Sequence, residues 1–309
     1  MRGKSLLAIG YPSLDYMIKV SDSVTFGQTT LIENDDNQCP NYGGCGVNIA
    51  YLVAQFSHKT GVAMRVGNDF QKTGYEKFLK DGQVNLEEVQ QIKSVPTSST
   101  RLIMNEAGDH ITLFYPGAME SKFHQATSFD HLSEFDYGVV TVCEPQYGQA
   151  FVNQCIKEKH PLIFSMKADF TSMPVAYIDQ VMQHSELIFM NEVEYSLLND
   201  KLPQPVKAYL NNPITQGIIV TQGGQGSYIY TKQEEIIIPA VKQVAVVDTA
   251  GGGDAYIAGF LHGYFSGKDL SVCGEYGSVL SAFIIEKIGC LSNVPTLEQF
   301  TERHQKNYN

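Results

Sequence analysis

Arginine is scarce in this sequence, and no run of basic residues compensates for it. Only four of the 309 residues are arginine (Arg2, Arg65, Arg101 and Arg303), and 22 basic against 33 acidic side chains give a formal net charge of −11. Surfaces that bind nucleic acids or anionic membranes need clustered lysine and arginine. The composition therefore argues against a nucleic-acid partner and against a membrane-surface partner.

Long apolar runs and closely paired cysteines are also missing. No run approaches the roughly 18 residues that span a bilayer, and the early apolar stretch Leu6–Ile9 is shorter than a signal-peptide core of about 7–15 residues. No C-x-x-C pair occurs, which argues against a zinc site. We expect a cytoplasmic protein with reduced thiols. The six cysteines are Cys39, Cys45, Cys143, Cys155, Cys273 and Cys290.

Several common catalytic motifs are absent as well. There is no G-x-x-x-x-G-K-[ST], so the chain is not a P-loop enzyme. Residues 10–15 (GYPSLD) follow the first apolar stretch where a dinucleotide-binding oxidoreductase would carry G-x-G-x-x-G. H-E-x-x-H and G-x-S-x-G are also missing.

From about residue 137 onward, short apolar runs alternate with amphipathic stretches. This alternation predicts a parallel sheet that helices cover on both faces, with ligands beyond the carboxyl ends of the strands. Strands are expected at residues 137–142, 161–165, 186–190, 217–221, 235–238 and 241–247. Helices are expected at residues 146–159, 191–198 (opening at an Asn cap), 255–265 and 279–288.

The N-terminal third has a different pattern, which predicts a small sheet serving as a lid. Residues 99–104 and 110–115 flank a turn cluster at 105–109 and predict a β-hairpin, with further strands at 16–20 and 29–32. The lid strands are drawn from about residues 11–40 and 97–118. No linker rich in proline or glycine marks a boundary, so we expect one domain over residues 1–309.

The most informative segment is residues 247–260, VDTAGGGDAYIAGF. Three consecutive glycines stand where an extended segment enters a helix, so their amides can converge on an anion near the helix N-terminus. Asp254 follows them in the first helical turn. Beside an anion site this carboxylate can serve as a general base toward an attacking hydroxyl. A helix-capping role is the alternative.

A second glycine pair occurs in residues 41–52, NYGGCGVNIAYL. Gly43 and Gly44 allow close approach of a ligand to the backbone. Asn48 can donate to and accept from a hydroxyl, and Asp15 stands just beyond the first strand. A carboxylate and an amide together suit the diol of a ribose or another sugar. The alternatives are a turn residue for Asp15 and a helix-start side chain for Asn48.

Together the two windows, G-G-x-x-x-N-x-A and D-T-x-G-x-G-D-x-[FY]-x-x-G-F, resemble the PfkB, or ribokinase-like, family of sugar and nucleoside kinases. The resemblance covers nearly the whole chain. It implies a three-layer α/β sandwich with a central, mostly parallel sheet and a small β-sheet lid. It also implies an ATP-dependent phosphotransferase acting on a hydroxymethyl group of a nucleoside or sugar. A fructose- or ribose-type sugar kinase and a non-catalytic sensor on the same fold are the alternatives.

The resemblance assigns a role to each motif residue. Asp254 is implied as the catalytic base, with an anion hole made of Ala250, Gly251, Gly252 and Gly253. The resemblance implies that the hydroxyls of the acceptor substrate are bound by Asp15, Gly43, Gly44 and Asn48. The N-x-x-E element, Asn191 and Glu194, is linked to magnesium and phosphate, and the T-x-G-x-x-G turn at the ATP site is matched by Thr221, Gly223 and Gly226. ATP and Mg²⁺ are the implied cofactors, K⁺ is a further candidate, and a homodimer through the lid is implied as well.

A third window bears on the acceptor. Residues 113–119 (LFYPGAM) and 10–15 resemble segments of bacterial adenosine kinases, which implies that Phe114 stacks on a nucleobase. A lid or interface core residue is the alternative for Phe114. Residues 165–169 (SMKAD) depart from the amide-rich segment of those enzymes. Lys167 and Asp169 could read another base or a sugar, or be solvated, so the acceptor stays open. We expect phosphate affinity to depend on magnesium and little on lysine or arginine.

Overall fold

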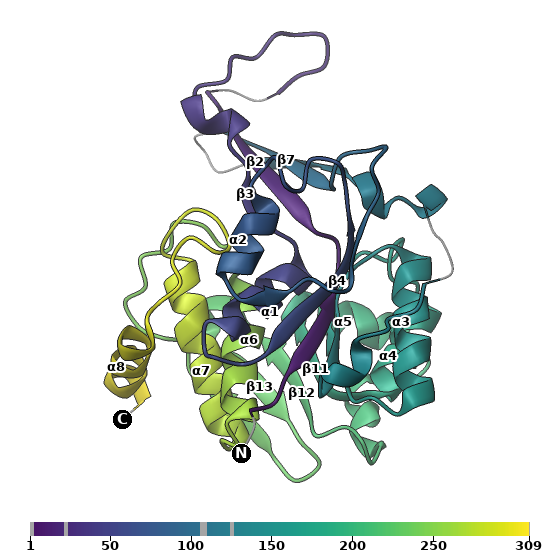
Figure 1. Ribbon diagram of the computed structural model, residues 1–309. Coiled ribbons are helices and arrows are strands. Elements are labelled where there is room, and N and C mark those ends of the chain that lie inside the picture. The colour runs from purple at the N-terminus through teal and green to yellow at the C-terminus, as the bar shows by residue number, and fades with distance from the viewer. Residues whose placement is uncertain (1–2, 22–23, 106–109, 124–126, 309) are drawn as a thin grey trace.

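The computed structural model describes residues 3–21, 24–105, 110–123 and 127–308 (Figure 1). These residues form a ten-stranded main sheet and a separate four-stranded sheet. Within the described residues, no helix is long and apolar enough to cross a membrane.

The main sheet is mostly parallel and has the strand order β14-β13-β12-β11-β10-β9-β1-β4-β5, with β6 also paired to β4. Its strands are β1 (Leu6–Ile9), β4 (Thr60–Val66), β5 (Val84–Asn85), β6 (Val89–Gln91), β9 (Tyr137–Val140), β10 (Leu162–Ser165), β11 (Ser185–Asn191), β12 (Gly217–Thr221), β13 (Ser227–Tyr230) and β14 (Glu235–Ile238). Only the pairings of β13 with β12 and β14 are antiparallel among these described strands.

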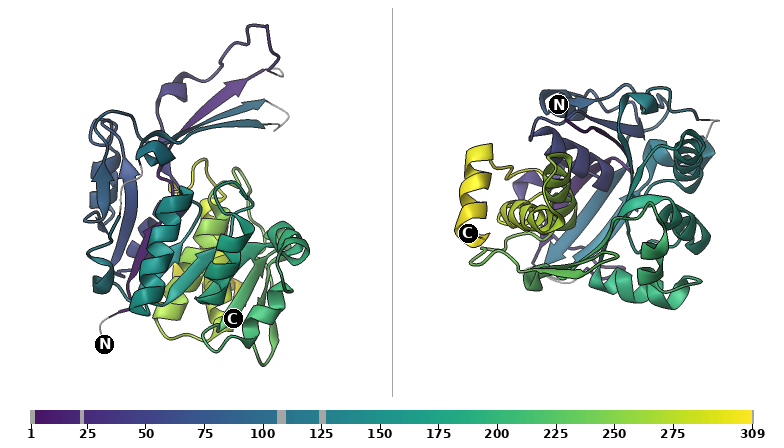
Figure 2. Two further views of the ribbon diagram at one scale, coloured as in Figure 1. Left: turned by 90° about the vertical axis from the view of Figure 1, so that its right-hand side faces the viewer. Right: turned by 90° about the horizontal axis from the view of Figure 1, so that it is seen from below.

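Side chains alternate along the strands between two apolar cores, one on each face of the sheet. In β1, Leu6 and Ala8 belong to one core, and Leu7 and Ile9 belong to the other. The first core is covered by α1 (Cys45–Ala54), α2 (Tyr75–Asp81), α6 (Gly252–Phe265), α7 (Leu270–Ile284) and α8 (Leu297–Tyr308). The second is covered by α3 (Pro145–Glu158), α4 (Val175–Gln183) and α5 (Glu192–Lys201). The three layers, visible in Figure 2, confirm the expected sandwich.

The small sheet stands away from the main sheet at its upper end (Figure 2, left). It has the order β3 (Asn41–Gly43), β2 (Ser13–Val20), β7 (Ser99–Asn105) and β8 (His110–Tyr115). The β7–β8 hairpin is confirmed, although most of its predicted turn, residues 106–109, lies outside the described residues. The pairing of β2 with β7 is parallel, whereas β3 and β8 pair antiparallel at the edges.

Two predicted strands and one helix boundary were wrong. Residues 29–32 contribute only an isolated bridge between Val20 and Ile32. Residues 241–247 have an apolar pattern but pair with no strand of the described residues, and the Val247 amide donates instead to the Ile285 carbonyl at 2.8 Å. The helix expected at 279–288 is the end of α7, which already stops at Ile284. Apolar periodicity therefore located apolar segments correctly, but it could not show whether a strand partner was present.

Candidate active site

Asp254 lies in the first turn of α6, directly after the glycine turn. One oxygen of its carboxylate accepts a hydrogen bond from Asn48 Nδ2 on α1 at 2.8 Å. Burial raises the pKa of Asp254, while the charge of Lys167 and hydrogen bonds from Asn48 and Cys45 lower it. Asp254 is thus a partly exposed carboxylate with a raised pKa, and neighbouring donors support its charged form, as a general base requires.

Asn48 also presents an unsatisfied acceptor to the same region. Its side chain is 2% exposed, and its Oδ1 atom has no hydrogen-bond partner among the described residues. A Cβ atom placed on Gly43 would lie 3.9 Å from this oxygen and 2.5 Å from Asp15 Oδ2. Because a buried unpaired acceptor costs about 1–3 kcal/mol, this oxygen is a fitting partner for a ligand hydroxyl between Asp15 and Asn48.

Asp15 lies on β2 in a row of residues that crosses the small sheet. Its register partners are Asn41 on β3 and Thr100 on β7, and Thr100 is paired with Phe114 on β8. Burial raises the pKa of Asp15, whereas hydrogen bonds from Ser13 and Thr100 lower it. Asp15 and Phe114 therefore share one face of the lid.

Phe114 is 47% exposed, so it has room for a ligand. The ring of Tyr11 meets it edge to face, with centroids 5.1 Å apart. Burial raises the pKa of Tyr11 to about 12, so its hydroxyl is neutral at physiological pH. No sequence pattern indicates that Tyr11 contacts Phe114, because the two residues belong to segments that are distant in the chain.

The two glycines at the start of α1 have different surroundings. Gly44 has φ +107°, and a Cβ there would lie 2.1 Å from the carbonyl oxygen of Tyr11. Its lack of a side chain is thus explained by packing of the β1–β2 connection against α1. Gly43 is the one of the pair that adjoins Asp15.

On the other side of Asp254, a cavity of about 80 Å³ connects it with the residues expected at the phosphates. Asn191, Glu194 and Thr221 line this cavity together with Gly253. They come from the carboxyl ends of β11 and β12 and from the first turn of α5. The remaining lining residues are Ser165, Met166, Lys167, Phe189, Met190 and Ile257.

Glu194 fits a magnesium-related role better than Asn191 does. The two form a capping box: Asn191 Oδ1 accepts from the Glu194 amide at 2.8 Å, and Glu194 Oε2 accepts from the Asn191 amide at 2.9 Å. Glu194 is 5% exposed, and burial raises its pKa. Carboxylate oxygens are preferred Mg²⁺ ligands, and those of Glu194 and Asp254 belong to the same cavity.

The ATP-turn glycines do not line this cavity. Gly223 and Gly226 shape the connection between β12 and β13, with φ values of +53° and +96°. No atom lies within 4 Å of a Cβ on Gly223, whereas one on Gly226 would meet the Ile238 carbonyl oxygen at 2.0 Å. Gly226 is therefore required by packing, and Gly223 faces open space beside Thr221.

Only part of the expected anion hole has free amides. The Ala250 amide donates to Asp248 at 2.9 Å, and the Gly252 amide donates to the Thr249 carbonyl at 3.2 Å. The amides of Gly251 and Gly253 have no acceptor among the described residues. These two amides, at the N-terminus of α6, are available to an anion.

A family model for the pfkB family carbohydrate kinases matches residues 5–297. The chain belongs to this family. The pfkB membership confirms the resemblance found in the sequence, and it makes the chain an ATP-dependent kinase of a carbohydrate or nucleoside.

Similar proteins include kinases of both acceptor classes. A nucleoside kinase of Methanocaldococcus jannaschii is 28% identical over 311 residues, covering 99% of each chain, and a ribokinase of Schizosaccharomyces pombe is 25% identical over 309 residues, covering 95% of each. The crystal structure of the M. jannaschii nucleoside kinase aligns with a TM-score of 0.88 at 26% identity over 99% of each chain. A Burkholderia thailandensis nucleoside kinase in complex with inosine aligns with a TM-score of 0.86 at 22% identity over 98% of each chain.

In this pfkB kinase the structure separates Lys167 from Asp169. Asp169 Oδ1 accepts hydrogen bonds from the amides of Thr171 and Ser172, each at 3.1 Å, and so stabilises its own loop. Lys167 instead lines the cavity beside Asp254. The sequence had suggested phosphate binding with little help from basic side chains, and it had offered Lys167 only as a residue that reads a base or a sugar or is solvated.

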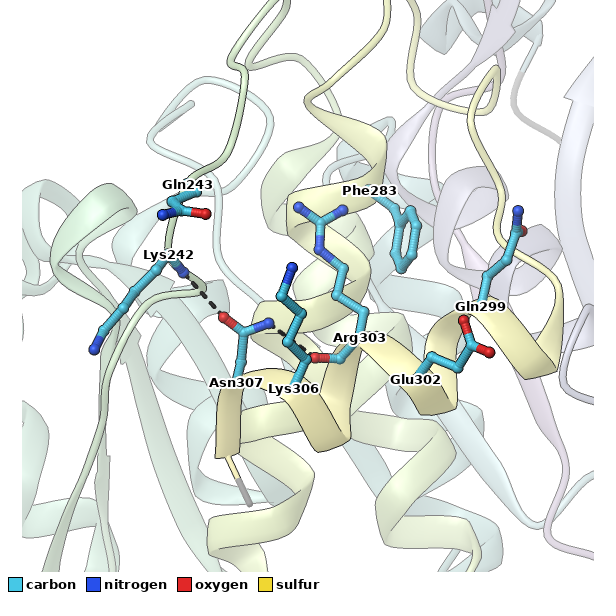
Figure 3. Close-up of a pocket in the computed structure, with 8 residues that line it drawn as sticks. All are labelled: Lys242, Gln243, Phe283, Gln299, Glu302, Arg303, Lys306 and Asn307. Carbon is cyan, nitrogen blue, oxygen red and sulfur yellow. Dashed lines mark hydrogen bonds between the residues drawn. The ribbon is translucent and has the colours of Figure 1, made fainter.

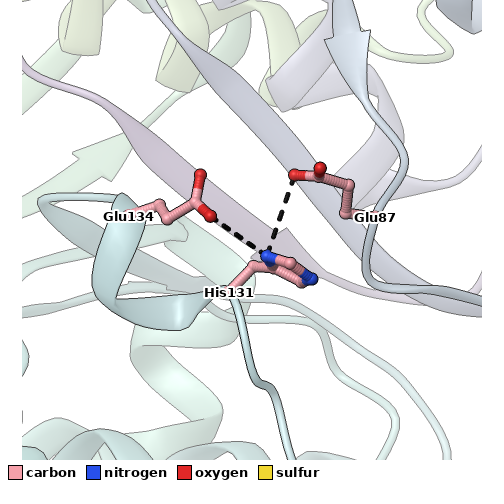
Figure 4. A group of neighbouring side chains, drawn as sticks. All are labelled: Glu87, His131 and Glu134. Carbon is pink, nitrogen blue, oxygen red and sulfur yellow. Dashed lines mark hydrogen bonds and ion pairs between the residues drawn. The ribbon is translucent and has the colours of Figure 1, made fainter.

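Two other polar groups of the kinase lie away from this site. A cavity of about 520 Å³ between residues 242–243 and α8 is lined by Lys242, Arg303 and Lys306 (Figure 3). Arg303 is paired with Glu286 at 2.6 Å. His131 lies 3.0 Å from Glu134 and 3.9 Å from Glu87 (Figure 4). Glu87 and Glu134 are exposed, and Lys59 already pairs with Glu134. Among the described residues, neither group offers a catalytic arrangement.

Proposed function

We propose that this kinase transfers the γ-phosphoryl group of ATP to a hydroxymethyl group of a nucleoside, with Asp254 as the general base. The position of Asn48 carries the proposal. One end of its amide donates to Asp254, and the other end is a buried, unpartnered acceptor beside Asp15. A ribose bound by Asp15 and Asn48 would place a further hydroxyl next to the Asp254 carboxylate.

In the proposed reaction, Asp254 takes the proton of the acceptor hydroxyl as its oxygen attacks the γ-phosphorus. The bond between that phosphorus and the β–γ bridging oxygen breaks, and ADP leaves. The free amides of Gly251 and Gly253 donate to the oxygens of the transferring group, and such donors are typically worth about 10²–10³-fold in rate. When bound, Mg²⁺ neutralises phosphate charge, and Glu194 is the residue we assign to it. The family resemblance alone implies K⁺, and assays with KCl in place of NaCl test whether the kinase depends on it.

A nucleoside is favoured over a simple sugar by the aromatic residues on the lid. Phe114 lies two strands away from Asp15 on the same face, a distance of about 10 Å at ordinary strand spacing. This separation suits a ribose at Asp15 and a base against Phe114 and Tyr11. Relatives named as nucleoside kinases over 95% or more of their length support the same acceptor class.

An acceptor panel tests the proposal. ADP release is followed with inosine, adenosine, other nucleosides, ribose and fructose, and the phosphorylated position of each product is identified. We expect the highest kcat/KM with a nucleoside, phosphorylated on its hydroxymethyl group. A clear preference for ribose or fructose would instead identify a sugar kinase. Tight binding of nucleosides without turnover would identify a sensor.

Truncation of Phe114 should weaken nucleoside binding selectively. Stacking of a base on an aromatic side chain is worth about 1–3 kcal/mol, so Phe114→Ala should raise the nucleoside KM about 10-fold or more and change a sugar KM little. Steady-state kinetics with both acceptors measure this. Ile214→Ala removes another exposed apolar side chain (41% exposed) as a control. Equal effects of Phe114→Ala on both acceptors would contradict stacking.

We also propose that two copies of the kinase associate through the lid. Leu113 is 54% exposed, on the face opposite Phe114, and Phe26 and Leu31 near the lid are fully and 75% exposed. Burial of such side chains favours association. Light scattering should give a mass of about twice the chain mass of 34.2 kDa. The Leu113→Lys substitution should lower the measured mass toward that of a single chain. Leu297→Lys, at an exposed leucine of α8, is the control, and an unchanged mass for Leu113→Lys would contradict this interface.

A further inference from the structure

Lys167 is the only basic residue among the described residues that line the Asp254 cavity. It follows the end of β10 at Ser165. The next two strands, β11 and β12, end at Asn191 and Thr221, which line the same cavity. Lys167 thus lies where adjacent parallel strands end, the usual ligand position in such sheets.

The backbone around Lys167 is fixed by hydrogen bonds on both sides. The Met166 amide donates to the Phe189 carbonyl at 2.8 Å and extends the pairing of β10 with β11. The Asp169 amide donates to the Lys167 carbonyl at 2.8 Å, and Asp169 stabilises the following turn through its side chain. The start of the lysine side chain is therefore held in place before any ligand arrives.

The ammonium group of Lys167 has no hydrogen-bond or ion-pair partner among the described residues. The side chain is exposed, and its Nζ atom makes no hydrogen bond or ion pair within 4.0 Å to any described residue. The sulfur of Cys45 and the carboxylates of Asp254 and Glu194 raise the pKa of Lys167. Because burial raises the pKa of Cys45 to about 12, that thiol is neutral at pH 7. The two carboxylates are therefore the groups that stabilise the charged ammonium form of Lys167. Three N–H donors remain for an anion.

The charges around the cavity favour such a cation in addition to the Mg²⁺ assigned to Glu194. Asp254 and Glu194 place two carboxylates beside the position where a triphosphate would add further negative charge. The amides of Gly251 and Gly253 contribute only the partial positive charge of a helix N-terminus. A full positive charge at Lys167 offsets this repulsion at close range, where Coulomb interactions are strongest.

We propose that Lys167 is a catalytic residue that binds the phosphoryl group during its transfer from ATP, an inference that rests on the proposed kinase reaction. Its ammonium group donates to oxygens of the group as the bond to the β–γ bridging oxygen breaks and the bond to the acceptor oxygen forms. The acceptor proton goes to Asp254, and ADP carries away the electron pair of the broken bond. Lys167 itself keeps its protons throughout.

The first test measures affinity for a mimic of the phosphoryl group without needing an acceptor. Calorimetry compares the binding of Mg–ADP with and without fluoroaluminate to the wild type, Lys167→Met and Lys167→Arg. Lys167→Met should bind ADP within about 3-fold of the wild type but lose at least about 10-fold of the tightening that fluoroaluminate produces, as expected for loss of a charge-assisted hydrogen bond. Lys167→Arg should retain part of it. Lys232→Met, at an exposed lysine between β13 and β14, is the control.

The second test uses turnover and its pH dependence. Lys167→Met should lower kcat by about 10²–10³-fold with a smaller change in acceptor KM. Because the charge of Lys167 lowers the pKa of Asp254, its removal should also move the acidic limb of the kcat/KM profile to higher pH. Lys167→Arg should leave that limb close to its wild-type position, which a merely structural role would not predict.

The outcomes separate the two proposals. Fluoroaluminate tightening that is equal in the wild type and in folded Lys167→Met overturns the role of Lys167, whatever the acceptor is. Tightening that depends on Lys167, in a protein that phosphorylates no member of the acceptor panel, supports the residue and contradicts the proposed acceptor. If the wild type turns over normally and Lys167→Met has the same kcat, the proposed role of Lys167 is wrong, but the proposed kinase function is not contradicted.

Discussion

Replacement of Asp254 with asparagine is expected to lower kcat by about 10²–10⁴-fold, the usual contribution of a positioned general base. Asparagine has nearly the same shape and still offers an oxygen to Asn48 Nδ2, which donates to this position at 2.8 Å. The fold and the binding of both substrates should therefore remain within about 3-fold of the wild type. Coupled ADP release gives kcat, and calorimetry gives the two dissociation constants.

The pH profile provides an independent check on Asp254. A general base must be deprotonated, so activity falls as pH drops through its pKa. Burial raises the pKa of Asp254 above 3.8 in the folded protein, so the acidic limb should lie above the value for a free carboxyl group, and it should disappear in Asp254→Asn. Asp200→Asn at an exposed site of α5 is the control. Undiminished kcat in Asp254→Asn would remove the base assignment.

The parts of the site that the sequence predicted are those set by short-range geometry. Asn191 and Glu194 form a capping box because they are three residues apart at the start of α5. Gly251 adopts φ +74° at the start of α6, where the glycine run predicted a turn into a helix. Such features depend on a few neighbouring residues, so a motif contains most of the information that specifies them.

The parts that the sequence missed depend on contacts between distant segments. Lys167 and Asp254 line one cavity only because the end of β10 lies beside the start of α6, and Tyr11 meets Phe114 only after the lid has formed. No periodicity or spacing in the sequence predicts that these pairs of residues lie close together. The same reason explains residues 241–247, which resemble a strand in composition but have no partner strand in the part of the chain that the structure describes. Family resemblance supplied the overall topology but not the side chains peculiar to this chain.

Gly253→Ala is expected to reduce activity without harming the fold. Gly253 lies within α6 and lines the cavity, and a Cβ placed on it meets no atom within 4 Å. Alanine in a helix is about 0.5–1 kcal/mol more favourable than glycine, so the melting temperature should stay constant or rise. The new methyl group would occupy the space beside the free Gly253 amide and displace the phosphoryl group. A displacement of about 1 Å can cost about 10²-fold in rate.

Gly251→Ala supplies the contrast, because there the obstruction is the protein itself. Gly251 is left-handed, which costs a residue with a Cβ about 1–2 kcal/mol, and the new atom would lie 2.7 Å from Cys290 Cβ. Thermal unfolding should show Gly251→Ala destabilised and Gly253→Ala unchanged or stabilised, while kinetics should show kcat reduced about 10²-fold in Gly253→Ala. Wild-type turnover in a stable Gly253→Ala would mean that the transferring group lies elsewhere. A stable but inactive variant would instead place that group against the N-terminus of α6, beside Asp254.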